Sequence, residues 1–258
     1  MRLIRLDPHG HLYDAYSLEE WVNAALVNLM PEDEIEAAVI IVDRCGQDSF
    51  ARIKNEVKPF GAWEVTQFDS AGQAIVGSIS RQGRSLNIIR GVQYVSSEKM
   101  EVLAFGISRT QEDGSLSCRD LISEIKSLGG VACLPWAPGK WLGSRGRVIS
   151  EILANSSPNN LVLGDIAIRP RFILPSAVLN RGETAGFKVL CGTDPLPRPE
   201  DVNIVGSYGI EFESSRGFKD GVSVKEILAV IASAHGFKRV WGKPNTPFKA
   251  LRRFISSL

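Results

Sequence analysis

Apolar runs that alternate with capped amphipathic segments are the feature that most limits the fold of this 258-residue chain. Ala37 to Val42 is a continuous apolar run rich in β-branched residues, a pattern typical of a strand covered on both faces. Before it, Ser17-Leu-Glu-Glu20 forms a capping box at the start of an amphipathic segment that reaches Leu29. Because strands and helices follow one another in this way, the sequence predicts parallel βαβ units and an α/β fold.

The same alternation continues along the chain. It predicts a helix that begins after Ser117 and ends at Gly129-Gly130, and the glycine-punctuated segment from Phe60 to Phe105 predicts hairpins. The tail after Pro247 has the pattern of a basic amphipathic helix. No low-complexity linker divides the chain, so we expect a single domain over residues 1–258. The other predicted elements are strands at Leu3–Leu6, Val131–Leu134, Leu161–Leu163, Phe187–Cys191 and Ile210–Phe212, and helices at 49–57, 147–154, 175–184 and after Ser223.

Charge and cysteine content limit the partners and the compartment. Thirty basic and 29 acidic residues leave a formal net charge of +1, which argues against nucleic acid as a partner without excluding it. The four cysteines show no Cys-x-x-Cys spacing, so neither a disulfide framework nor a zinc ribbon is expected. A reducing compartment follows, and we expect the protein to be cytoplasmic. No run approaches the ~18 apolar residues of a membrane span, so no membrane partner is expected.

Two of the three histidines stand in the run Leu6-Asp7-Pro8-His9-Gly10-His11, directly after the first predicted strand. Side chains two residues apart share one face of a strand, so both imidazoles point the same way. A pair of neutral imidazoles is a common metal-binding arrangement. The alternative interpretation is a histidine pair held by hydrogen bonds to a carboxylate such as Asp194.

Polar residues also follow the later predicted strands. Parallel barrels place their chemistry at the carboxyl ends of strands, where the side chains of different strands converge. We therefore expect an aspartate and two histidines to meet at one mouth. The segments in question are Asp43-Arg44-Cys45, Arg90-Gly91-Val92-Gln93, Pro135-Trp136-Ala137 and Gly192-Thr193-Asp194.

The order of these pieces resembles the PHP (polymerase and histidinol phosphatase) domain over nearly the whole chain. The run Asp7-Pro-His9-Gly-His11-Leu-Tyr13-Asp14 is similar to the family's opening Asp-x-His-x-His pattern, and Thr193-Asp194-Pro195-Leu196 is similar to its final Ser-Asp-x-His. The resemblance implies a distorted TIM-like (β/α) barrel of seven strands with a metal cluster at the strand ends. It also implies a phosphoesterase that attacks its substrate with metal-activated water.

Carried over residue by residue, the resemblance assigns His9, His11 and Asp194 to the first metal. Gln93 stands where the family has a bridging glutamate. Arg44, Trp136 and Leu196 stand where the family has further metal ligands. None of these side chains binds a metal ion, which argues against a trinuclear centre. Further carboxylates that could hold a second ion are Asp7, Asp14 and Asp43. The alternative is that Asp7 and Asp43 cap loops or orient neighbouring groups and that Asp14 is a turn residue before the Ser17 cap. We therefore expect one divalent ion, zinc, manganese or iron, and two at most.

The missing ligands leave phosphate charge to be neutralised by basic side chains. Arg169, Arg171 and Lys140 are candidate anion-binding residues, although the two arginines could equally be surface or ion-pairing groups. Arg44 and Gln93 join Asp194 as candidate catalytic residues. Two hypotheses follow: a metal-dependent phosphoesterase acting on a small phosphorylated ligand, or a PHP-like protein without catalysis that serves as a structural module or binds an anion.

Overall fold

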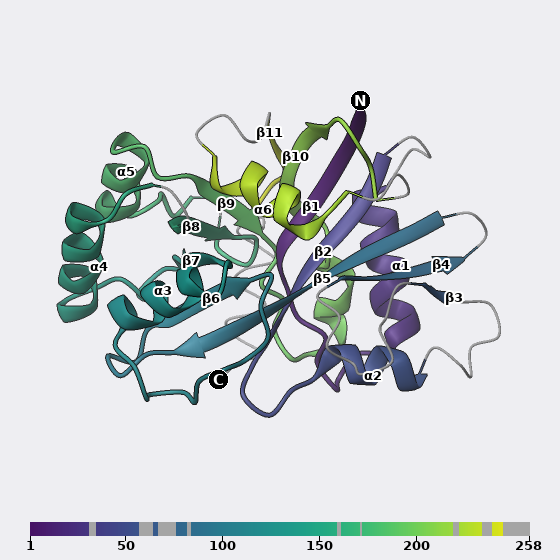
Figure 1. Ribbon diagram of the computed structural model, residues 1–258, viewed down its shortest axis with the longest axis horizontal. Coiled ribbons are helices and arrows are strands. Elements are labelled where there is room, and N and C mark those ends of the chain that lie inside the picture. Colours follow the sequence, from purple (N-terminus) through teal and green to yellow (C-terminus); the bar gives the residue numbers. More distant parts are fainter. Residues whose placement is uncertain are drawn as a thin grey trace.

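The computed structural model describes residues 1–30, 35–56, 64–66, 76–81, 84–158, 161–170, 172–218, 222–233 and 239–244 (Figure 1). The strands are β1 (Arg2–Gly10), β2 (Ile35–Asp43), β3 (Glu64–Thr66), β4 (Val76–Arg81), β5 (Arg84–Val95), β6 (Glu101–Phe105), β7 (Val131–Pro135), β8 (Leu161–Ile166), β9 (Val189–Gly192), β10 (Tyr208–Ser214) and β11 (Arg239–Gly242). The helices are α1 (Leu18–Leu29), α2 (Ser49–Glu56), α3 (Cys118–Ser127), α4 (Ser144–Asn155), α5 (Ala177–Thr184), α6 (Val224–Ala232) and the 3-10 helix η2 (Pro199–Ile204).

One curled sheet contains all of these strands. Its order is β11-β10-β1-β2-β5-β6-β7-β8-β9, with β4 beside β5 and β3 beside β4. Directly after β9, the N–H of Asp194 donates to the carbonyl oxygen of His9 at 2.8 Å. The end of β9 therefore meets the end of β1, and the sheet becomes a nearly closed barrel.

The α/β prediction is confirmed, but one detail of the sheet is corrected and another is not confirmed. The described strands of the main path number nine, so the expected count of seven is not confirmed. The pairs β1–β2, β2–β5, β7–β8 and β8–β9 are parallel, as expected, whereas β5–β6, β6–β7 and β1–β10 are antiparallel. Short connections join antiparallel strands, and the hairpins predicted between Phe60 and Phe105 supply β4–β5 and β5–β6.

β2 is buried along its whole length, as its apolar run predicts. Val39 and Ile41 belong to the cluster that packs under α1, and Ile40 and Val42, which point the other way, belong to the cluster inside the barrel. Successive side chains of a strand alternate between its two faces, so both faces of β2 are covered. The prediction of a doubly covered strand is confirmed.

Helix α6 closes one end of the barrel. Its side chains Ile227, Leu228 and Ile231 join the same interior cluster as residues from β1, β2 and β5 to β10. A Cβ placed on Gly106 would lie 2.5 Å from Leu228, which shows how closely α6 approaches the chain that follows β6. Because β6 runs antiparallel to β7, this end holds the start of β7. The carboxyl ends of the parallel strands therefore lie at the other end.

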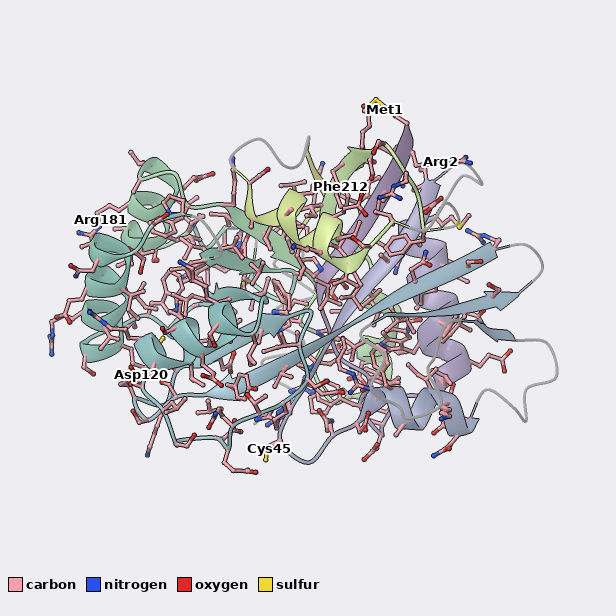
Figure 2. All side chains as sticks on the ribbon, viewed as in Figure 1. Met1, Arg2, Cys45, Asp120, Arg181 and Phe212 are labelled. Carbon is pink, nitrogen blue, oxygen red and sulfur yellow. The ribbon has the colours of Figure 1, made fainter. Side chains whose placement is uncertain are left out.

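Figure 2 shows Met1, before β1, and Cys45, just after β2, on opposite sides of the molecule, so the parallel strands β1 and β2 both end on the side of Cys45. The predicted helix starts are confirmed at Ser17, Ser117 and Ser223, whose hydroxyls accept backbone N–H groups. None of the described helices has the length and hydropathy to cross a membrane. The predicted helix after Pro247 lies outside the described residues, as does Arg171.

Candidate metal centre

His9, His11 and Asp194 come together at the carboxyl end of β1. One ligand atom from each lies within 4.8 Å of the others. Asp194 Oδ1 is 3.4 Å from Nε2 of His9 and 3.5 Å from Nε2 of His11. Both imidazoles are buried, and Asp194 is 13% exposed. The convergence that the strand ends predicted is present, and among the described residues no other group of three His, Cys, Asp or Glu has this geometry.

The donor set fits a divalent ion. Nε2 of His9 and Nδ1 of His11 are buried and have no hydrogen-bond partner among the described residues. Such groups are costly unless another ligand satisfies them. Burial lowers the pKa of His9 to about 3, so this imidazole is neutral at pH 7 and keeps a lone pair for a metal. Two imidazoles and one carboxylate are ligands that zinc, manganese and iron accept.

Asp194 is ionised at the centre of this group. Burial alone would raise its pKa, but attraction to His9, a hydrogen bond with His11 and the charge of Lys140 together hold the pKa well below its usual range. Its backbone has a φ of +45°, a conformation that aspartate adopts more readily than most residues. The carboxylate is therefore a charged ligand presented from a tight turn.

The side chain of Asp7 connects this turn to β1 through hydrogen bonds. Its Oδ1 accepts the N–H of His9 at 3.1 Å and of Thr193 at 3.0 Å. Its Oδ2 accepts the N–H of Gly206 at 3.0 Å and the hydroxyl of Thr193. With four donors on its two oxygens, this fully buried carboxylate positions His9 and Asp194, although the sequence suggested it as a possible additional ligand.

The other two suggested carboxylates lie apart from the cluster. Asp43 accepts the N–H and the hydroxyl of Ser49, at 3.0 and 2.5 Å, and so caps the start of α2. The side chain of Asp14 is fully exposed and lies 3.9 Å from Arg52. Neither carboxylate joins His9, His11 and Asp194 in the group described above.

A tyrosine connects the cluster to Arg44. The ring of Tyr13 stacks on His11, with ring centroids 5.0 Å apart and an interplanar angle of 23°. Arg44 lies close enough to the Tyr13 hydroxyl for its charge to favour the ionised form. Burial and the charge of Asp194 raise the pKa of Tyr13 to about 12, so the hydroxyl stays protonated at neutral pH. Arg44 is thus held on the same side of the molecule as the histidine cluster.

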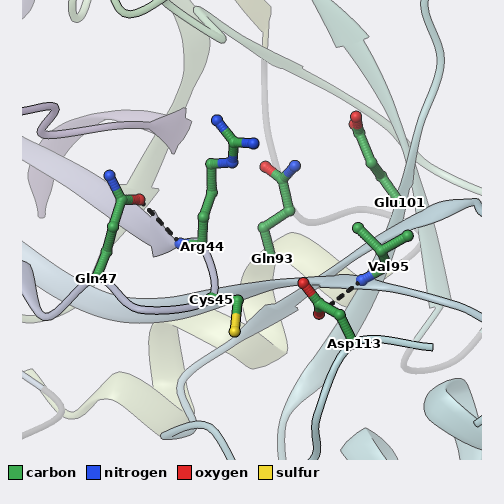
Figure 3. Close-up of a pocket in the computed structure, with 7 residues that line it drawn as sticks. All are labelled: Arg44, Cys45, Gln47, Gln93, Val95, Glu101 and Asp113. Atoms are coloured by element: carbon green, nitrogen blue, oxygen red, sulfur yellow. Dashed lines mark hydrogen bonds between the residues drawn. The ribbon is translucent and has the colours of Figure 1, made fainter. Parts of the chain in front are cut away.

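Lys140 approaches the cluster from the loop after β7. Its ammonium forms an ion pair with Glu101, and its charge acts on both His9 and Asp194. Gln93 and Arg44 line a pocket of about 290 Å³ together with Cys45, Gln47, Val95, Glu101 and Asp113 (Figure 3). The structure therefore brings three of the predicted residues, Arg44, Gln93 and Lys140, to the same mouth.

Arg169 has a different environment. Its Nε and one terminal nitrogen donate to both oxygens of Asp165, at 2.6 and 2.7 Å, and its other terminal nitrogen donates to the carbonyl of Ile173. Tyr208 also donates to Asp165, at 2.8 Å. This geometry agrees with the alternative that Arg169 forms an ion pair within the protein instead of binding an anion. Trp136, buried beside it, is a wall of this region rather than a ligand.

Sequence reasoning missed three contributors to the site. Thr193 holds Asp7, Glu101 orients Lys140, and Gly192 allows β9 to approach β1, because a Cβ on Gly192 would lie 2.5 Å from the Cβ of His9. All three act across the sheet, between segments far apart in the chain. The run Gly192-Thr193-Asp194 at a strand end was the one local signal that could have pointed to two of them.

No protein-family model matches this chain, and no curated protein matches it. Solved structures do match. PsfC from Pseudomonas syringae PB-5123 has a TM-score of 0.58 at 14% identity, with 100% of this chain and 97% of PsfC covered. Endonuclease Q from Pyrococcus furiosus, described as a lesion-specific endonuclease, has a TM-score of 0.55 at 12% identity, with 92% of this chain and 57% of that chain covered.

A second Endonuclease Q structure holds a 27-mer duplex substrate with an abasic lesion at the active site, and it matches with a TM-score of 0.53 at 12% identity, covering 92% of this chain and 58% of that one. This chain thus spans a little over half the length of Endonuclease Q. A two-domain protein from Bacteroides vulgatus with a predicted PHP-like metal-dependent phosphoesterase has a TM-score of 0.49 at 12% identity, covering 98% of this chain and 69% of that one. At these identities the likeness concerns the fold alone.

Proposed function

We propose that this protein is a metal-dependent phosphoesterase in which His9, His11 and Asp194 hold one divalent ion. The observation that carries the proposal is the buried pair of imidazoles whose Nε2 atoms lie 3.4 and 3.5 Å from one carboxylate oxygen of Asp194, with Nε2 of His9 left without a hydrogen-bond partner among the described residues. A bound ion would supply a Lewis acid and a water with a pKa of ~7. A neighbour in fold, Endonuclease Q, is described as a lesion-specific endonuclease, which agrees with chemistry at a phosphate ester.

The protein's own cations take the role of binding the phosphate. The charge of Arg44 acts on Tyr13 and the charge of Lys140 acts on His9 and Asp194, and Lys140 is oriented by its ion pair with Glu101. A guanidinium and an ammonium that are already in position before the reaction stabilise the charge that develops on phosphoryl oxygens in the transition state. Gln93, neutral and beside Arg44 in the pocket wall, orients the ester without adding charge.

The test is hydrolysis of 4-nitrophenyl phosphate by protein reconstituted with zinc, manganese or iron. Wild-type protein should turn the ester over with at least one of these ions. His9→Ala and Asp194→Ala should each lose at least about 100-fold in rate, since even partners outside the ligand shell contribute about 10–100-fold at metal sites. Circular dichroism would establish that both variants fold.

The competing hypothesis is a binding module without catalysis. It agrees with the presence of Trp136 and Leu196, whose side chains cannot bind a metal, at positions where the PHP family has metal ligands. It predicts that phosphate or a phosphate ester binds while no metal-dependent turnover is seen. Turnover that survives in both the His9 and the Asp194 variants would show that a different site is responsible.

A further inference from the structure

The pocket beside the metal centre has an unusual lining for a small-molecule site. Such sites are mostly apolar, with a few polar groups that fix orientation. Here Arg44, Gln47, Gln93, Glu101 and Asp113 supply polar groups, and Val95 and Cys45 complete the lining. A ligand that fits this pocket must itself be polar on most of its surface, because an apolar one would leave these groups desolvated and without partners.

The polar groups are arranged as a set. Figure 3 shows the guanidinium of Arg44, the amide of Gln93 and the carboxylate of Glu101 pointing to the same side, with Cys45, Val95 and Asp113 below them. The guanidinium donates hydrogen bonds, the carboxylate accepts them, and the amide does both. A hydroxyl group can donate and accept at once, so hydroxyls on neighbouring carbons match such a lining.

The charges of the pocket largely cancel. The ion pair of Glu101 with Lys140 uses Oε2, and Asp113 receives both Arg109 and the N–H of Val95 on Oδ1. Among the described residues, these contacts leave the second oxygen of each carboxylate to accept from a ligand. Each carboxylate is already paired with a cation, so Arg44 is the one described lining residue with a cationic group for a phosphate. The pocket therefore suits the uncharged part of a substrate, with the phosphate at its rim near Arg44.

Size and composition argue against a nucleotide. The volume of about 290 Å³ is at the lower end of small-molecule sites, which span roughly 300–1,000 Å³. The described residues that line the pocket include no aromatic ring, whereas proteins that bind single-stranded or flipped bases stack them on aromatic side chains. A body of the size of a monosaccharide is favoured over a nucleobase.

Two neighbouring groups relate this pocket to the histidine cluster. Arg44 lines the pocket, and its charge acts on Tyr13, whose ring stacks on His11. Glu101 lines the pocket from the other side and binds Lys140. A molecule with its phosphate between Arg44 and Lys140 would thus place its alcohol portion in the pocket.

We infer that the substrate is the phosphate monoester of a small polyhydroxylated alcohol, such as a monosaccharide, whose hydroxyls are bound by Gln47, Gln93, Glu101 and Asp113. This inference rests on the proposed function for its hydrolytic step. In that step the P–O bond to the sugar oxygen breaks, a water oxygen forms the new P–O bond, and a proton passes to the departing alkoxide. The products are the free sugar and inorganic phosphate.

The test compares glucose 6-phosphate with hexyl phosphate, because both leave as primary alcohols and differ mainly in the hydroxyls. The ratio of their kcat/KM values should favour glucose 6-phosphate by at least about tenfold, since a site built to bind hydroxyls rejects analogues that lack them. Gln47→Leu should lower this ratio at least about fivefold. Gln111→Leu, a matched change at a glutamine that contacts Glu124 outside the pocket, should leave the ratio unchanged.

The outcomes separate the two proposals. If 4-nitrophenyl phosphate is hydrolysed but hexyl phosphate is as good a substrate as glucose 6-phosphate, the pocket assignment is wrong and the proposed function stands. If no ester is hydrolysed, the proposed function fails. The pocket assignment is then decided by calorimetry, in which the affinity for glucose 6-phosphate should exceed the affinity for hexyl phosphate by at least about tenfold. Preferential cleavage of a DNA duplex with an abasic site would also overturn the inference.

Discussion

The carboxylate of Asp7 binds both the backbone N–H and the hydroxyl of Thr193, which lies 186 residues further along the chain. The same carboxylate accepts the N–H of His9. One side chain therefore determines the distance between the end of β1 and the end of β9. It sets the separation of His9 and Asp194, on which the candidate metal centre depends.

Asp7→Asn should loosen this junction. An amide nitrogen would replace one carboxylate oxygen and face two donors, so we expect the free energy of unfolding to fall by about 1–3 kcal/mol. The metal affinity should fall about 10–100-fold, as for other partners that position metal ligands. Urea unfolding and zinc titration measure the two effects. Asp14→Asn, at a fully exposed carboxylate, is the control and should change neither.

Gly192→Ala should displace His9. The new methyl group would lie 2.5 Å from the Cβ and 3.0 Å from the backbone nitrogen of His9, so one of the strands must shift. We expect a lower metal affinity, measured by competition with a chelating dye. Gly182→Ala also creates a 2.5 Å contact, with Leu163 beneath α5, and should cost stability without changing metal affinity. Equal metal affinity in the two variants would argue against this account.

The stability of the metal-free protein should depend on His9 in acid. Burial lowers the pKa of His9 from 6.5 to about 3, so the folded state prefers the neutral imidazole. The stabilisation is complete above pH 6.5 and is lost as the pH falls toward 3, with a slope of up to about 1.4 kcal/mol per pH unit. Urea unfolding at several pH values in the presence of a chelator measures it. His9→Gln should have a smaller slope in this window, and an unchanged slope would contradict the assignment.

Lys140 and Arg169 should behave differently when they are replaced. Lys140→Ala should raise the KM for 4-nitrophenyl phosphate about tenfold, the equivalent of about 1.4 kcal/mol of binding. Arg169→Met should lower stability by about 1–3 kcal/mol, because it leaves the buried Asp165 without its bidentate partner, and should leave KM unchanged. Steady-state kinetics and thermal unfolding of both variants check this. A raised KM in the Arg169 variant would restore that residue to the anion-binding group.

Local sequence patterns predicted the elements well where one rule was sufficient. The apolar run of β2 and the serine caps of α1, α3 and α6 depend on neighbouring residues, and all are confirmed. Helix α4 begins at Ser144, earlier than the predicted 147, because no side chain caps its start and Gly143 provides no periodic signal. The expected count of seven strands is not confirmed, because pairing partners around a barrel are not encoded locally.

The candidate site shows the same division. The His-x-His spacing and the strand-end position of Asp194 were sufficient to predict which side chains converge. For Asp7 and Asp43 the sequence allowed either a metal ligand or a group that caps a loop and orients its neighbours, and their hydrogen-bond donors confirm the second role. The pocket formed by β2, β5, β6 and their loops also depends on tertiary packing alone.

The most direct test of the central claim is the metal content of the purified protein. After incubation with zinc, manganese or iron and exhaustive dialysis, elemental analysis should find about one equivalent of one of these ions in the wild-type protein. Folded His11→Ala and Asp194→Ala variants should retain far less. Less than about a tenth of an equivalent in the wild-type protein, or equal metal content in the wild-type protein and both variants, would contradict a metal centre at His9, His11 and Asp194.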